Sequence, residues 1–292
     1  MLRNSFLLFI TGLLAVGAVQ LSAQQANDPP KVLRIFVEDV KEGKAAGHEK
    51  SEAGFMEAVA KANYPASILG MTSMTGSPQA WFLEAHESFD SISKAESTLD
   101  STQFQTLDAL DAEFRAGSHS WIAVYRPDIS FHGAEMMQAL PKARVFNVIM
   151  LHVQGGHEDD FAELGKLAVN AAQKAIYDQP VAVYQVVSGL PNGTYLFFEP
   201  STSLKSLDGQ AERSQALMQA MGDAGAKRFA KLEADSVASS EARLFLLNPK
   251  MSYVEKEFAD VDPDFWNTKP LENERAVRKP SAKPKAKTAA AK

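Results

Sequence analysis

Six histidines carry the side chains best suited to acid–base or metal chemistry in this 292-residue sequence, which contains no cysteine. No two of them are four residues apart, the spacing that places two imidazoles on one face of a helix, and no His-Glu-x-x-His segment occurs. The lack of cysteine also excludes thiolate ligands, disulfides and a cysteine nucleophile. We therefore expect no metal site. The histidines are His48, His86, His119, His132, His152 and His157.

His48 and His157 are distinguished because each stands in a Gly-His-Glu tripeptide before a segment with helical spacing. Such an imidazole either helps to start the helix or points into the gap between helix and sheet. Polar and aromatic residues on strands could line a pocket there, although aromatic residues on strands usually belong to the core. No serine-hydrolase elbow, phosphate-binding loop or dinucleotide fingerprint is present, so no catalytic set can be assembled. The candidate ligand-binding residues are His48, Trp81, Tyr125, Arg126, His157 and Tyr184.

The elements that would position these residues occur twice in the same order. Each half begins with a β-branched and aromatic strand, followed by the Gly-His-Glu helix, a proline, two strands joined by a Gly-x-Pro turn, a helical region and a last strand. Both halves close on the pattern Pro-x-[Ile/Met]-Ser-[Phe/Tyr]. Five matches in one order predict a duplication, with modules at 32–132 and 143–254.

The order β-α-β-β-α-β predicts a ferredoxin-like module, in which both helices cover one face of a four-stranded antiparallel sheet. The other face is apolar and must be buried. Two modules in one chain can cover each other's bare faces. We therefore expect an α+β protein of two tandem ferredoxin-like modules packed sheet to sheet.

Several segments resemble the dimeric α/β-barrel superfamily, whose small members include antibiotic-biosynthesis-type monooxygenases. These are the opening strand, the turn at 40–44, the Gly-His-Glu helix start, Trp81-Phe82 and Ser88-Phe89. The resemblance covers about 32–254 and implies an intrachain dimeric α/β barrel. The superfamily also contains isomerases, haem-degrading enzymes and chlorite-dismutase-like haem proteins, so it does not fix a function.

The resemblance also bears on cofactors. The chlorite-dismutase-like members carry the axial histidine in the second module, where this chain offers only His152 and His157, on the first strand and at the first helix start. We therefore expect no cofactor, and haem stays open as the alternative.

The flanking segments predict where the protein is found. Arg3, an apolar run and Leu21-Ser22-Ala23 form a signal peptide over 1–23, with cleavage between Ala23 and Gln24. Residues 255–271 hold aromatic residues that we expect to pack on the body, and 272–292 form a Lys/Pro/Ala tail that we expect to be disordered. We expect a bacterial periplasmic or secreted protein with no transmembrane segment after signal removal.

Charge limits the partners. All 36 acidic residues precede Arg275, so the body is more acidic than the net charge of −6 and would repel nucleic acid. The basic tail could contact an anionic envelope surface. We expect an exported protein that binds a small hydrophobic or aromatic ligand between sheet and helices. One alternative is a cofactor-independent monooxygenase or isomerase on the same fold, and a second is a structural envelope-associated protein.

Overall fold

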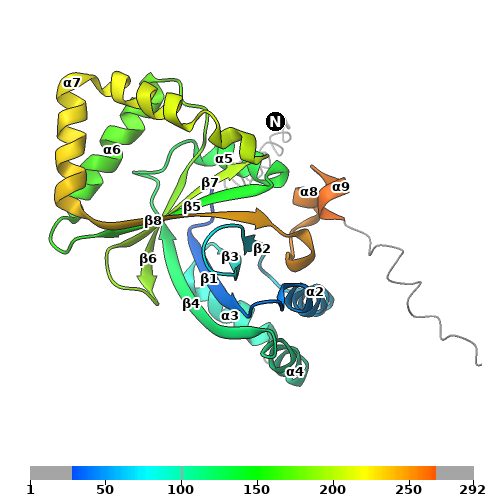
Figure 1. The fold of residues 1–292 in the computed structure, drawn as a ribbon. Coiled ribbons are helices and arrows are strands. Elements are labelled where there is room, and N and C mark those ends of the chain that lie inside the picture. Colours follow the sequence, from blue (N-terminus) through cyan, green and yellow to red (C-terminus); the bar gives the residue numbers. More distant parts are fainter. Residues whose placement is uncertain (1–27, 100, 268–292) are drawn as a thin grey trace, which may run out of the picture.

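Eight antiparallel strands close into one barrel in the computed structural model, which describes residues 28–99 and 101–267 (Figure 1). Around the barrel the strands follow the order β1-β3-β2-β8-β5-β7-β6-β4. The strands are β1 (Val32–Val40), β2 (Ile68–Ser73), β3 (Gln79–His86), β4 (Arg115–Tyr125), β5 (Val145–Val153), β6 (Ala182–Ser188), β7 (Thr194–Ser201) and β8 (Val237–Leu247).

Each half of the chain contributes four neighbouring strands in equivalent order, β4-β1-β3-β2 and β8-β5-β7-β6. The halves meet edge to edge, where β2 pairs with β8 and β4 pairs with β6. This corrects the expectation of two sheets packed face to face and agrees with the barrel that the resemblance implies. Edge pairing satisfies the backbone groups that two separate sheets would leave open, and closure turns both apolar faces into one shared interior.

Alternation along the strands decides which side chains face that interior. In β1, Leu33, Ile35 and Val37 join the central apolar cluster, whereas Arg34 and Glu38 lie on the opposite face toward the helices. Aromatic side chains from both halves fill the centre, which makes the barrel a packed core. They include Trp81, Trp121, Phe146, Phe198 and Phe245.

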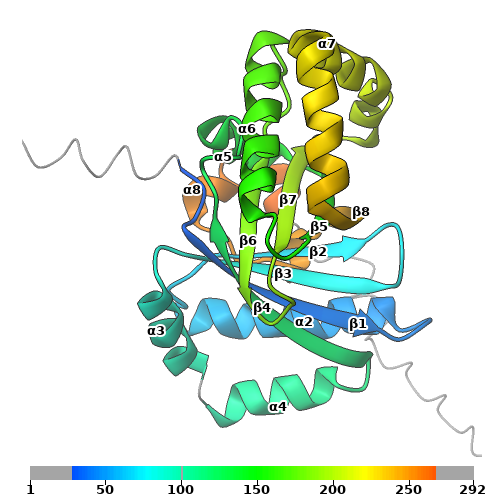
Figure 2. The same ribbon diagram turned by 90° about the vertical axis from the view of Figure 1, so that its left-hand side faces the viewer.

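Two helical layers cover the outside of the barrel, one over each half (Figure 2). The first contains α2 (Ala45–Lys61), α3 (Phe89–Leu99) and α4 (Thr102–Asp111), and the second contains α6 (Glu158–Lys174) and α7 (Gln210–Ser236). Helix α7 bends at Gly222, whose φ of 67° lies in the left-handed region. Apolar clusters fill both helix–sheet layers, so each helix is held by its buried face.

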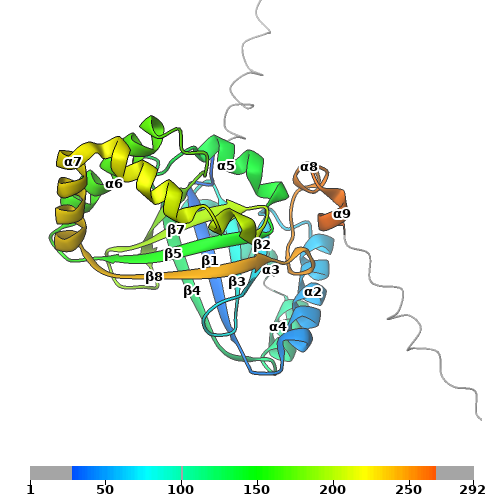
Figure 3. The same cartoon turned by 45° about the horizontal axis from the view of Figure 1, so that its top comes forward.

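Short helical elements connect the two halves and lie beside the barrel. Helix α5 (Gly133–Ala139) and the 3₁₀ turn η1 (Leu140–Lys142) join the halves, with η2 (Leu204–Leu207) and η3 (Pro249–Met251) elsewhere in the second half. Helices α8 (Lys256–Ala259) and α9 (Pro263–Trp266) lie together beside the barrel (Figure 3). Trp266 is buried there, and its indole N–H donates to the carbonyl oxygen of Pro141 at 2.7 Å.

The signal peptide predicted over 1–23 and the tail predicted over 272–292 lie outside the described residues. No helix between 28 and 267, as far as the structure describes that stretch, combines the length and apolar character needed to cross a membrane.

Candidate functional site

The six candidate ligand-binding residues do not form one site. His48 lies between helix α2 and strand β1, whereas Trp81 lies inside the barrel. Tyr125 and Tyr184 pack against each other, with ring centroids 5.4 Å apart, and the Tyr184 hydroxyl donates to the Pro30 carbonyl oxygen. Trp81 and His48 therefore belong to two separate groups of side chains, one inside the barrel and one in the helix–sheet layer.

Arg126 and His157 are engaged in local contacts. The Arg126 guanidinium pairs with Asp128 and donates to the Tyr195 hydroxyl. Nδ1 of His157, at the start of α6, lies 2.9 Å from an Asp160 carboxylate oxygen. The Asp160 contact agrees with the interpretation that His157 helps to start helix α6.

A cavity of about 200 Å³ opens at one end of the barrel interior, beside Trp81. Trp121 and Phe245 stand against Trp81, with ring centroids 5.1 Å and 4.9 Å away. Strands of both halves line the cavity, because closure brings β3 and β4 opposite β5 and β8. The lining residues are Gln79, Trp81, Trp121, Val148, Met150, Leu190, Glu241, Arg243 and Phe245. We call this cavity the barrel-end pocket.

Polar groups converge on one wall of the barrel-end pocket. The Gln79 amide oxygen accepts hydrogen bonds from the Trp81 indole N–H at 3.0 Å and from Arg243 at 2.6 Å. The Gln79 amide nitrogen donates to Asp39, and Arg243 Nε donates to Glu241. These hydrogen bonds fix the orientation of the Trp81 indole and of the Arg243 guanidinium in the same pocket.

A second, more open cavity of about 510 Å³ adjoins the barrel-end pocket and shares Met150, Leu190 and Glu241 with it. Its other lining residues are His152, Pro191, Thr194, Ser239 and Ser240. Both cavities lie at the end of the barrel, so they differ in place from the expected pocket between sheet and helices. The helix–sheet layers are filled by side chains instead.

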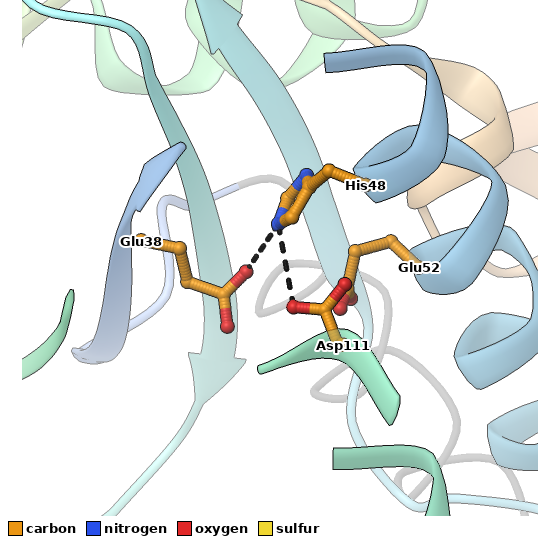
Figure 4. A group of neighbouring side chains, drawn as sticks. All are labelled: Glu38, His48, Glu52 and Asp111. Atoms are coloured by element: carbon orange, nitrogen blue, oxygen red, sulfur yellow. Dashed lines mark hydrogen bonds and ion pairs between the residues drawn. The ribbon is translucent and has the colours of Figure 1, made fainter. Parts of the chain in front are cut away.

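His48 is part of a buried cluster in the helix–sheet layer of the first half (Figure 4). Its Nε2 lies 2.7 Å from a Glu38 carboxylate oxygen and 3.6 Å from Asp111 Oδ2. Glu52 follows His48 by one turn of α2, so its carboxyl group reaches the same space. Arg115 on β4 donates to the other Glu38 oxygen at 2.6 Å. We call Glu38, His48, Glu52 and Asp111 the His48 cluster.

The carboxyl groups of the His48 cluster repel one another when they are ionised. Burial, together with the negative charges of Glu38 and Asp111, raises the pKa of Glu52 to about 9, against the opposing attraction of Arg115. Burial also raises the pKa of Asp111, against the opposing attraction of His48. Glu52 is therefore protonated at neutral pH when nothing else balances the cluster.

A second buried polar network on the same face of β1 is fully paired. Glu84 accepts hydrogen bonds from Arg34 at 2.7 Å, from His86 at 2.8 Å and from the Tyr64 hydroxyl. Despite the opposing effect of burial, hydrogen bonds from His86, Arg34 and Tyr64 lower the pKa of Glu84. His86 also contacts Ser91, so this network has the character of a structural ion pair.

The sequence reasoning missed Glu38, Asp111, Gln79 and Arg243. A signal was present for the first of these, because Glu38 occupies the position that Leu151 holds on β5 in the second half. Helix α2 likewise carries Glu52 at the position where α6 carries Phe161. The Phe161 ring packs on the Tyr195 ring, with centroids 4.5 Å apart. Acidic residues at positions that are apolar in the other half mark a place where the core was replaced by a polar group.

Comparisons with known proteins agree with the fold. No protein-family model matches the chain, and no curated protein does. Among solved structures, a "putative monooxygenase" from Fusobacterium nucleatum matches with a TM-score of 0.50 at 11% identity, over 75% of this chain and 93% of that one. At this identity the likeness concerns the fold alone.

Two further structures match less closely. A "putative monooxygenase" from Lactobacillus acidophilus has a TM-score of 0.47 at 8% identity, over 74% of this chain and 93% of that one. A chlorite dismutase variant from Candidatus Nitrospira defluvii, in complex with cyanide, has a TM-score of 0.48 at 11% identity, over 79% and 96% of the two chains.

The expectation of a protein without a cofactor is corrected by this comparison, because chlorite dismutases, the haem proteins of the resemblance above, are among the matching structures. The helix–sheet layers of the described chain do not fit a haem, however. Side chains fill both layers, and the buried His48 and His86 each contact a carboxylate through Nε2. His152 lines the open cavity at the barrel end.

Proposed function

We propose that the protein binds a small aromatic or apolar molecule in the barrel-end pocket. The observation that carries the proposal is an apolar hollow at the mouth of an otherwise filled barrel, with Trp81, Trp121 and Phe245 at its base. Ligand sites are concave, mostly apolar and oriented by a few polar groups, and barrel mouths are a usual place for them. Gln79 and Arg243 supply such polar groups here.

The size and chemistry of the pocket narrow the class of ligand. A cavity of about 150 Å³ lined by apolar residues accepts benzene, so about 200 Å³ suits a molecule of one or two rings. Aromatic faces at the base favour a flat ring, which stacks offset or edge-on. Arg243 at the opening favours a ligand that carries an oxygen acceptor, such as a phenol or a carboxylate.

An enzyme of the monooxygenase or isomerase type is the second candidate. It is motivated by the Fusobacterium protein of the same fold, whose name calls it a putative monooxygenase. In this version, Arg243, held in place by Gln79, would stabilise negative charge that develops on a bound phenol or enol. The two candidates share the pocket and differ in whether the ligand leaves unchanged.

Native mass spectrometry of protein purified from its own host tests the proposal directly. We expect a bound small molecule that is released on unfolding. Titration with one- and two-ring phenols and carboxylates, followed by calorimetry and by analysis of the ligand after incubation in air, then separates binding from turnover. Recovery of an oxidised or isomerised product favours the enzyme candidate, and unchanged ligand favours the binding protein.

A matched pair of substitutions locates the ligand. Leu190→Phe narrows both cavities at the barrel end and is expected to weaken binding at least tenfold. Leu204→Phe, on the exposed turn η2, is the control and should bind as the wild type does. Equal affinity in both variants would place the ligand elsewhere and contradict the proposal.

The origin and place of action are further parts of the proposal. We propose that the halves are two copies of one module, which the equivalent strand orders support. We also propose export, which rests on the apolar N-terminal segment that ends at Ala23. Sequencing the N-terminus of the protein from its host should find Gln24 or a nearby residue first. A protein that begins at Met1 and stays in the cytoplasm would contradict export and the envelope-associated alternative.

A further inference from the structure

The His48 cluster has the dimensions of a metal site. One ligand atom from each of Glu38, His48, Glu52 and Asp111 lies within 4.8 Å of all the others. Ligands about 2.0–2.2 Å from a zinc ion lie at most about 4.4 Å apart, so the four atoms need only small shifts to surround an ion. The side chains come from β1, α2 and α4, and all four point into one space (Figure 4).

Asp111 supplies an independent sign that a partner is absent. The residue is 2% exposed, yet among the described residues neither carboxylate oxygen has a hydrogen bond of normal geometry, although the Ser51 side chain is close enough to lower the pKa of Asp111. His48 Nε2 and Arg115 Nε lie 3.6 Å and 3.7 Å from Oδ2, within ion-pair range but too far for a hydrogen bond. A buried carboxylate with such incomplete pairing is costly, and a bound cation is one of the few arrangements that removes the cost.

The charges around the cluster also favour a cation. Glu38 and Asp111 share one guanidinium, that of Arg115, which also pairs with Asp108, and Glu52 adds a third carboxyl group that can ionise when a cation binds. The neighbouring network of Arg34 and Glu84 has no such excess, because each of its buried groups is paired. In the second half the equivalent space is apolar, so a polar group is not required there for folding.

We propose that the His48 cluster binds one divalent transition-metal ion, such as Zn²⁺, Mn²⁺ or Fe²⁺. One imidazole nitrogen with three carboxylates is a mixed set that suits these borderline ions, whereas Ca²⁺ and Mg²⁺ prefer oxygen ligands alone. The ion would replace the proton between His48 Nε2 and Glu38, which are 2.7 Å apart. Arg115 would then hold Glu38 from outside, as a second layer of contacts commonly does at metal sites.

Metal titration of chelator-treated full-length protein tests the proposal. Zn²⁺, Mn²⁺ and Co²⁺ are added separately, and binding is followed by calorimetry and by the visible absorption of bound Co²⁺. We expect one ion per chain for at least one metal, together with a Co²⁺ spectrum typical of nitrogen and oxygen ligands. Absence of binding at a one-to-one ratio for all three metals would overturn the proposal.

Two variants assign the site. Asp111→Asn keeps the side-chain shape and is expected to weaken binding at least tenfold. Glu52→Gln mimics the protonated glutamic acid, so it should stay folded and also weaken binding at least tenfold. Asp90→Asn, an exposed carboxylate on α3 paired with Lys94, is the control. Wild-type affinity in a folded Asp111→Asn or Glu52→Gln variant would overturn the proposal, and neither result depends on whether the barrel-end pocket binds a ligand.

Discussion

At the scale of single residues, the first half of the chain contains two buried polar groups that differ in how well they are paired. Both are built on β1, where Arg34 and Glu38 lie four residues apart on the face toward the helices. Arg34 and Glu84 satisfy each other, whereas Glu38 belongs to a cluster of three carboxyl groups beside one guanidinium. The fully paired Arg34–Glu84 network therefore has a structural role, whereas the incompletely paired His48 cluster can take up a ligand.

The pairing of Glu84 predicts a large loss of stability in Glu84→Gln. Removing the buried partner of this ion pair leaves the Arg34 guanidinium, 7% exposed, with only the exposed Glu96 as a counter-ion and costs about 3–5 kcal/mol. Chemical denaturation measures the free energy of unfolding. Glu96→Gln is the control, because Glu96 contacts the same arginine from an exposed position and should cost about 1 kcal/mol or less.

The lowered pKa of Glu84 gives this prediction a pH dependence. The ionised carboxylate is preferred in the folded state, so its contribution is present above the unfolded pKa of about 4.3 and is lost as pH falls through the lowered folded value. We expect wild-type stability to fall in that acidic range and Glu84→Gln to show a flatter curve. Parallel curves for the two proteins would mean that Glu84 is not preferentially ionised in the folded state.

Much of the local pattern could be predicted from sequence, but the candidate sites could not. His48 was identified from its tripeptide, whereas its partners Glu38 and Asp111 lie 10 and 63 positions away and meet it only after the sheet and helices pack. Trp81 was identified as an aromatic residue on a strand, but the pocket beside it needs β5 and β8 from the other half. Spacing along the chain carries no information about such contacts.

At the scale of elements, the tight turn at Gly189 holds together β4 and β6, one of the two strand pairs that join the halves. Gly189, in the turn after β6, has a φ of 95°, and a Cβ added there would lie 2.3 Å from the Ser120 carbonyl oxygen and 2.9 Å from the Trp121 ring. Only glycine fits this approach. The turn thus holds β6 against β4 and positions Leu190 over the barrel-end pocket.

Gly189→Ala is therefore expected to destabilise the protein by more than about 1 kcal/mol, because it adds both backbone strain and a steric clash. Gly155→Ala is the matched control, since a Cβ at Gly155 meets nothing within 4 Å. Thermal unfolding followed by circular dichroism compares the two. A melting temperature that falls no further in Gly189→Ala than in Gly155→Ala would contradict the close approach of this turn to β4.

At the scale of the whole molecule, the barrel depends on both halves. The two edge strands of the first sheet, β2 and β4, find their strand partners across the junction in β8 and β6 of the second half. Repeated strand order could be predicted from the repeated pattern, whereas edge closure was implied only by the resemblance to the dimeric α/β-barrel superfamily. The pattern shows that an apolar face must be covered without showing whether stacking or closure covers it.

Fragments 28–132 and 143–267 are expected not to fold as monomers, because each would expose two sheet edges and one apolar face. Light scattering and NMR dispersion of the separate fragments measure this. A fragment that folds only as a dimer agrees with the account, since a second copy can close the barrel. A well-dispersed monomer would show that one half needs no partner.

The barrel-end pocket is tested most directly by the indole N–H signals of the three tryptophans in a ¹⁵N-labelled sample. Trp81 and Trp121 line the pocket, whereas Trp266 donates to Pro141 beside the start of β5, away from the Met150 end. Addition of a one- or two-ring phenol is predicted to shift the signals of Trp81 and Trp121 and to leave that of Trp266 in place. A ligand that binds without moving either pocket signal, or that moves Trp266 alone, would contradict the proposed function.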